Sequence, residues 1–154
     1  MFIMKMNGDI RVRISKEHDQ VYNTLTKGVG IESHVLFFMG FCIAISKKLD
    51  PTPIKTRVDK FWSRTFDPQE WTSMYSVILD KNSVNLKAIE NDEEVIRQVE
   101  MYANAGISDF LDNIPQEYIR KSGGVISFAI DDKGEAIKDI LNFLMDIYLT
   151  QEEA

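Results

Sequence analysis

The sequence predicts a mainly α protein, a compact helical bundle around a central apolar helix. Three observations predict this class. Hydrophobic residues recur at helical spacing in several segments, the stretch 34–45 is apolar on nearly every face, and prolines and capping residues separate these segments. The chain has 154 residues, 44% hydrophobic and 27% charged, as expected for one globular domain. We therefore expect a single helical domain over residues 1–154.

The N-terminal part predicts a strand and then a helix. Apolar and basic residues alternate from Ile10 to Ile14, which is typical of a short strand. Ser15 is a suitable N-cap for a following helix, which is expected to close at Gly28. The other strand candidate is the segment 125–130. A minor two-stranded β element that pairs residues 10–14 with 125–130 is therefore one prediction for this chain.

The central helix is expected to begin at residue 32 or 33 and to run to about Leu49. Its apolar run from Val35 to Ile45 is much shorter than the roughly twenty residues that a bilayer span needs. We therefore interpret it as a core helix and expect no membrane contact. Asp50-Pro-Thr-Pro53 must leave the helix, because proline disfavours the helical conformation of the residue before it.

Further helices follow along the chain. Asp67-Pro-Gln-Glu70 has the pattern of a capping box with proline at the first helical position, so a helix is expected to start there. Another is expected near Val84. A third is expected to begin at residue 91 or 92 and to stop near Gly106, and a short helical piece follows over residues 107–114. The last helix is expected over residues 133–150, with a hydrophobic stripe along one side.

The charge is unevenly distributed between the two halves of the chain. Residues 1–66 hold 11 Lys and Arg against 6 Asp and Glu, whereas residues 67–154 hold the other 7 against 18, and the total net charge is -6. The basic residues that follow the central helix have Phe61 and Trp62 among them, a pattern that can hold a phosphate backbone. They are Lys47, Lys48, Lys55, Arg57, Lys60 and Arg64. An acidic protein partner is an equally good alternative, and the aromatic residues could instead belong to the core.

The remaining reactive residues show no catalytic or metal-binding pattern. His18 and His34 have no neighbouring ligands at the spacing of a metal site. Cys42 is the single cysteine and lies within the apolar helix, so we interpret it as a core residue of a protein from a reducing cytoplasm. No phosphate-binding glycine loop is present. We expect a protein that is not an enzyme and that has no cofactor and no metal.

Three pieces of the chain, in this order, resemble a known family. They are Phe38-Met-Gly-Phe41 in the apolar helix, Pro53-Ile54, and the segment Val99–Ile107. Together they resemble the small accessory proteins encoded with bacterial DNA phosphorothioation (Dnd) gene clusters, over roughly residues 12–114. Ala105 stands where the family pattern has glycine, and the segment beyond Pro115 has no counterpart in it. The resemblance implies a role in antiphage defence and carries over no catalytic residue.

The expected function is that of a non-enzymatic accessory subunit of a bacterial antiphage defence or DNA-modification complex. It would bind a larger protein subunit, an ATPase or a nuclease, and its basic residues would contact the DNA backbone. One alternative is a small DNA-binding regulator of the operon, which would require an exposed recognition helix. Another is a phage-encoded inhibitor whose acidic C-terminal half mimics DNA.

Overall fold

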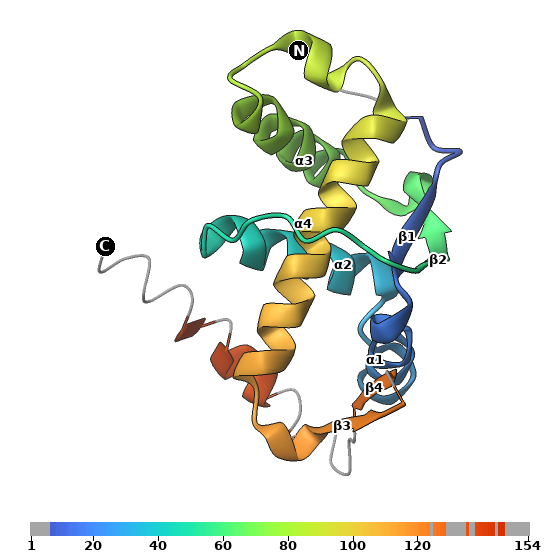
Figure 1. Ribbon diagram of the computed structural model, residues 1–154, viewed down its shortest axis with the longest axis vertical. Coiled ribbons are helices and arrows are strands. Elements are labelled where there is room, and N and C mark those ends of the chain that lie inside the picture. Colours follow the sequence, from blue (N-terminus) through green and yellow to red (C-terminus); the bar gives the residue numbers. More distant parts are fainter. Residues whose placement is uncertain (1–6, 124, 129–134, 136–137, 144, 147–154) are drawn as a thin grey trace.

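Helices dominate the computed structural model (Figure 1), which confirms the predicted fold class. The structure describes residues 7–123, 125–128, 135, 138–143 and 145–146. The α-helices are α1 (Asp19–Thr24), α2 (Ser33–Ser46), α3 (Pro68–Lys81) and α4 (Asp92–Asn113). The strands are β1 (Arg11–Ser15), β2 (Arg57–Trp62), β3 (Ile119–Ser122) and β4 (Val125–Phe128).

The core forms where α2 crosses α4 (Figure 1). The central helix α2 buries Leu36, Phe37 and Phe41, and α4 buries Ile107 and Phe110 on the facing side. The two backbones approach unusually closely. A Cβ atom built on Gly106 would lie 1.7 Å from the carbonyl oxygen of Gly40, so only glycine fits at this position of the crossing.

This close approach corrects the prediction that Gly106 ends a helix. The helix α4 passes through Gly106 without a break and ends at Asn113, so the short piece expected over residues 107–114 is the last part of α4. Glycine is rarely placed inside a helix because it lowers helix propensity, and it is common just after a helix end. The contact with Gly40, which lies 66 positions earlier in the chain, is the reason for glycine at this position.

The strands pair differently from the prediction. β1 pairs antiparallel with β2, and β3 pairs antiparallel with β4. Residues 10–14 therefore do not pair with 125–128, while residues 129 and 130 of that prediction lie outside the described residues. β4 takes the nearest partner because Gly123, at a φ of 58°, turns the chain tightly after β3. β2 reaches β1 because the proline segment after α2 carries the chain back alongside α4, where the Thr52 amide donates to the Met101 carbonyl.

The predicted start of α3 is confirmed. The Asp67 carboxylate accepts from the Glu70 amide at 2.8 Å, and the Glu70 side chain accepts from the Asp67 amide at 2.9 Å, which is a complete capping box. The helix expected near Val84 is only a 3₁₀ turn, Leu86–Ile89. It is preceded by Ser83 and Val84, both in the left-handed region, where α3 has ended.

The first predicted helix ends later in the structure than expected, and the last predicted helix can be compared only over its described residues. The first helix continues as a π-helical turn, Leu25–Val29, and closes at Gly30 in the left-handed conformation, two residues beyond the expected Gly28. Of the helix expected over residues 133–150, residues 135, 138–143, 145 and 146 are helical, and the rest lie outside the described residues.

Within the described residues, no single helix combines the length and the apolar composition of a membrane span. Among these described residues, the helical segments Lys16–Val29 and Ser33–Ser46 have both when taken together, but the chain bends by 119° between them.

Candidate nucleic-acid interface

The β1–β2 ribbon presents its charged residues on one face. Val12 and Ile14 point inward and are fully or almost fully buried, whereas Arg11 and Arg13 alternate with them and point outward. Phe61 on β2 supports the inner side, since its ring packs edge-on against Phe37 of α2 at 5.5 Å between centroids. The alternation of apolar and basic residues along β1 thus places its apolar side chains in the core and its arginines on the outer face.

An irregularity in the pairing determines which β2 residues share the outer face with Arg11 and Arg13. Arg11 lies opposite Trp62 and Arg13 lies opposite Asp59, so Lys60 is the extra residue of a bulge between these two pairs. At the far end of the ribbon, Arg57 lies opposite Ser15. Between these ends the face is about 13 Å long, close to the rise of four nucleotides in one strand of B-form DNA.

Two guanidinium groups contact the Trp62 ring. The Arg11 guanidinium carbon is 4.7 Å from the centroid of the indole ring and the Arg64 guanidinium carbon is 5.0 Å from it. The side chain nevertheless remains 38% exposed. Cation–π contacts of this length are attractive and fix the orientation of the ring. The arrangement is therefore an oriented, accessible aromatic surface with positive charge beside it.

Carboxylates neutralise this charge only in part. Asp59 lies 3.4 Å from Arg13 Nε and 3.9 Å from Arg11 Nε, and Asp9 lies 3.8 Å from Arg64. All these side chains are more than a third exposed, so water screens the ion pairs and each contributes little. We call this surface the basic ribbon face, and it consists of Arg11, Arg13, Arg57, Trp62 and Arg64. Its four guanidinium groups outnumber the two carboxylates.

The structure separates the six basic residues that the sequence predicted as one site. Lys47 donates to Asp109 at 2.6 Å and lies over the Phe143 ring, at the C-terminal end of α2. The ribbon contacts α2 near its opposite end, through Phe37, and Lys47 lies ten positions further along the helix, which corresponds to roughly 15 Å. Lys48 directly follows Lys47 in the chain, after the same end of the helix. Lys47 and Lys48 therefore do not belong to the ribbon face.

Lys60 is also withdrawn from this face. As the extra residue of the bulge it turns toward α1, where its amino group donates to Asp19 at 2.8 Å and to Asn23 at 2.7 Å. Of the six predicted residues, Arg57 and Arg64 belong to the ribbon face, and the exposed Lys55 precedes it.

Arg11 and Arg13 were missing from the predicted site. The signal that could have identified them was the alternation of apolar and basic residues, which already indicated an outward basic row on a strand. Their significance depends on β2 as the partner strand, because that pairing brings Trp62 and Arg57 to the same face.

A buried carboxylate holds this ribbon on α4. Glu100 is only 2% exposed, and it accepts from the Arg13 backbone amide at 2.8 Å. Arg97 pairs with Glu100 and also donates to the Arg11 carbonyl at 3.2 Å. Burial raises the pKa of Glu100, while the Arg13 amide and the Arg97 charge act in the opposite direction. The network fixes the backbone of β1, and with it the positions from which the Arg11 and Arg13 side chains project.

No protein family model, curated protein or solved structure matches this chain. The resemblance to proteins of phosphorothioation clusters accordingly stays a prediction. Among the residues that the structure describes, no group of three or more His, Cys, Asp or Glu side chains is arranged to hold a metal ion.

Proposed function

We propose that this chain is a non-enzymatic accessory subunit of a bacterial antiphage defence or DNA-modification complex. In this role it contacts a nucleic-acid backbone through the basic ribbon face and binds a larger protein subunit, an ATPase or a nuclease, elsewhere on its surface. The observation that carries the nucleic-acid part is the exposed Trp62 ring, which contacts both the Arg11 and the Arg64 guanidinium groups at the end of the β1–β2 strand pair.

This geometry suits a single strand with accessible bases. Guanidinium groups bind phosphate oxygens through paired hydrogen bonds, and an exposed indole ring stacks on any base. The ring contributes roughly 1–3 kcal/mol per stacked base, without sequence preference. Arg57, about 13 Å along the ribbon from Trp62, provides a further backbone contact. The expected binding is therefore salt-dependent and tolerant of sequence.

The protein partner is supported by the resemblance to the accessory proteins of phosphorothioation clusters. It implies a gene cluster whose products work together, and a small chain without a catalytic pattern fits an accessory role in such a cluster. Purification of the tagged chain from a host that expresses the whole native cluster tests this part. We expect a larger subunit to co-purify at a fixed ratio, and recovery of the chain alone would contradict the proposal.

The two alternatives are less well supported by the geometry. A regulator would need a recognition helix with a free polar face, but the central helix α2 is apolar, crosses α4 and buries six of its residues. A DNA-mimicking inhibitor would use the acidic half of the chain. The acidic residues Asp92, Glu93 and Glu94 lie in the first turn of α4, where the helix dipole already explains them.

Tryptophan fluorescence tests the nucleic-acid contact directly. The chain has two tryptophans, so a Trp71→Phe variant leaves Trp62 as the only indole. We expect a single-stranded oligonucleotide of mixed sequence to quench this fluorescence at low salt, because a stacked base quenches the ring it covers. A matched Trp62→Phe variant, which retains Trp71, should show little quenching, since Trp71 lies on α3, outside the ribbon.

The same pair of variants gives the results that would refute the proposal. If the Trp71→Phe protein shows no quenching at low salt, the ribbon face does not bind single strands. If both variants are quenched equally, the nucleic acid binds without stacking on Trp62, and the geometry of the ribbon is not the reason for binding.

A further inference from the structure

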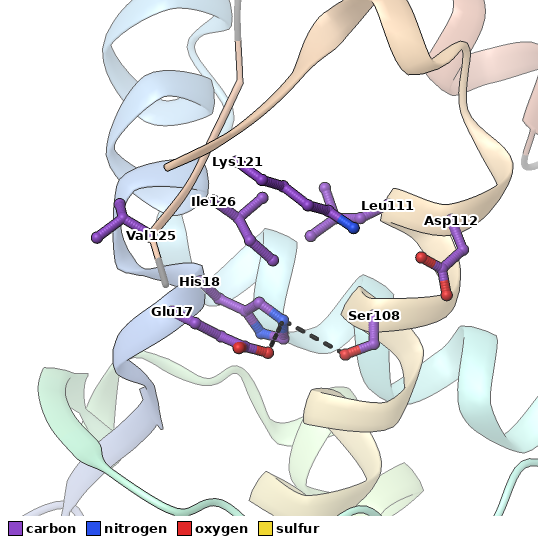
Figure 2. A pocket seen from close by; sticks show the side chains of 8 residues that line it. All are labelled: Glu17, His18, Ser108, Leu111, Asp112, Lys121, Val125 and Ile126. Carbon is purple, nitrogen blue, oxygen red and sulfur yellow. Dashed lines mark hydrogen bonds and ion pairs between the residues drawn. The ribbon is translucent and has the colours of Figure 1, made fainter. Parts of the chain in front are cut away.

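The surface has a hollow between the turn before α1, the helix α4 and the β3–β4 hairpin, which form its walls (Figure 2). It has a volume of about 370 Å³, within the range of small-molecule sites. Its polar lining consists of Glu17, His18, Ser108, Asp112 and Lys121. None of these residues belongs to the basic ribbon face, so a ligand site in this hollow is independent of the proposed function.

His18 forms the inner part of this hollow. Its side chain is 2% exposed, and its Nε2 atom lies 3.3 Å from Ser108 Oγ and 3.5 Å from Glu17 Oε1. Both neighbours face the same ring nitrogen, whereas a Ser-His-acid relay needs the acid on the opposite nitrogen. Burial lowers the pKa of His18, so the imidazole is neutral near pH 7. The side chain therefore serves as a hydrogen-bonding wall for a ligand.

Three charged groups converge on the hollow. Figure 2 shows the Lys121 amino group reaching over the cavity, Asp112 on the α4 side and Glu17 beside His18. Neither Asp112 nor Lys121 has an ion-pair partner in the part of the chain that the structure describes, and Glu17 contacts only the neutral His18. With two carboxylates and one ammonium group, the site carries one excess negative charge.

The remaining wall is aliphatic. Leu111 of α4 is almost fully buried at the base, and Val125 and Ile126 of β4 close the hollow from the hairpin side. Such a wall favours a ligand with an apolar stem between its charged groups. A ligand that complements the whole site therefore has two cationic groups, one anionic group and an aliphatic chain.

We propose that this hollow binds a free amino acid with a cationic side chain, of the lysine and arginine class. The ligand's carboxylate binds Lys121, and its two cationic groups bind Asp112 and Glu17, with Ser108 and His18 as hydrogen-bond partners. The aliphatic stem packs on Leu111 and Ile126. The ligand's net charge of +1 then balances the excess charge of the site.

Calorimetric titration of the full chain with L-lysine and L-arginine tests this inference. We expect at least one of them to bind with a Kd of roughly 1 mM or tighter. Norleucine lacks the side-chain ammonium group and cadaverine lacks the carboxylate, so each should bind at least tenfold more weakly than L-lysine. The amide signals of Ser108 and Lys121 in a nuclear magnetic resonance titration should shift with L-lysine.

Two variants and two matched controls complete the test. Asp112→Asn and Lys121→Met should each weaken L-lysine binding at least tenfold. Asp80→Asn and Lys81→Met remove the same charges from exposed positions at the end of α3, and they should leave binding unchanged. The inference is overturned if neither amino acid binds. It is also overturned if norleucine or cadaverine binds as well as L-lysine, or if the control variants weaken binding as much as the site variants.

Discussion

Replacing Gly106 by alanine tests the closest contact of the fold. The added Cβ would meet the Gly40 carbonyl oxygen at 1.7 Å and the Gly40 carbonyl carbon at 2.5 Å. Ordinary contacts of a Cβ begin at 3.4 Å, so the two backbones would have to separate by about 1.7 Å, which is the difference between these distances. No side-chain rotation can relieve this overlap, because both atoms of Gly40 belong to the backbone.

The expected loss of stability in Gly106→Ala follows from this displacement. Overpacking a core costs roughly 1–3 kcal/mol when side chains can adjust, and a backbone clash lies at or above the upper end of that range. Alanine restores about 1 kcal/mol of helix propensity relative to glycine. We therefore expect a net loss of at least about 2 kcal/mol in the free energy of unfolding. For a chain of this length, that corresponds to about 4–8 °C in Tm.

Urea unfolding followed by circular dichroism measures this loss. Gly40→Ala is a comparison variant with a less severe overlap. Its Cβ would meet Ile107 Cγ1 at 2.8 Å and the Ala103 carbonyl oxygen at 2.9 Å. Ile107 can change rotamer, so this variant should lose less stability than Gly106→Ala. If Gly106→Ala is as stable as the wild type, or more stable, the close crossing of α2 and α4 is wrong.

Three further changes test other parts of the structure. Asp67→Ala removes the capping box of α3 and should cost about 1 kcal/mol in urea unfolding, whereas an unchanged stability would mean that the cap contributes nothing. The folded-state pKa of His18 lies below its ordinary value of 6.5, so the unfolded state binds the proton first. The contribution of neutral His18 to the free energy of unfolding should therefore be fully present above about pH 6.5 and decrease as the pH is lowered. The free energy of unfolding should depend less on pH in His18→Gln, and an equal pH dependence in both proteins would contradict this. Val84 is 66% exposed and has a φ of 58°, a left-handed backbone conformation that is strained for a residue other than glycine. Val84→Gly should therefore raise the free energy of unfolding by about 1 kcal/mol. A lower stability of this variant would mean that the backbone at Val84 is not strained.

Features that depend on a few neighbouring residues were predictable from the sequence. The capping box at Asp67 is an example, because its two hydrogen bonds join residues only three positions apart. The apolar composition of α2 similarly predicted a central core helix. In both cases the local pattern and the final packing favour the same structure.

Features that depend on distant contacts were not predictable in this way. Gly106 has the local pattern of a helix end, but its contact with Gly40 places it inside α4. Lys47 and Lys60 belong to a basic stretch in the sequence, yet Asp109 and Asp19 bind them after folding. Arg11 entered the site only because β1 pairs with β2. The basic residues of one sequence segment therefore do not by themselves predict a basic surface. The pairing of strands decides which basic residues share a face.

The salt dependence of single-stranded DNA binding tests the basic ribbon face most directly. Three arginines of this face are replaced together, as Arg11→Gln, Arg57→Gln and Arg64→Gln. The control variant has the same change in net charge at exposed lysines elsewhere, as Lys27→Gln, Lys81→Gln and Lys87→Gln. Affinity is measured by fluorescence anisotropy over a series of salt concentrations.

If the ribbon arginines contact three phosphates, the slope of log affinity against log salt should become shallower by about 2 in the arginine variant, and it should change little in the lysine variant. If both variants change by the same amount, binding reflects only the overall charge of the chain, and the basic ribbon face is not the nucleic-acid interface.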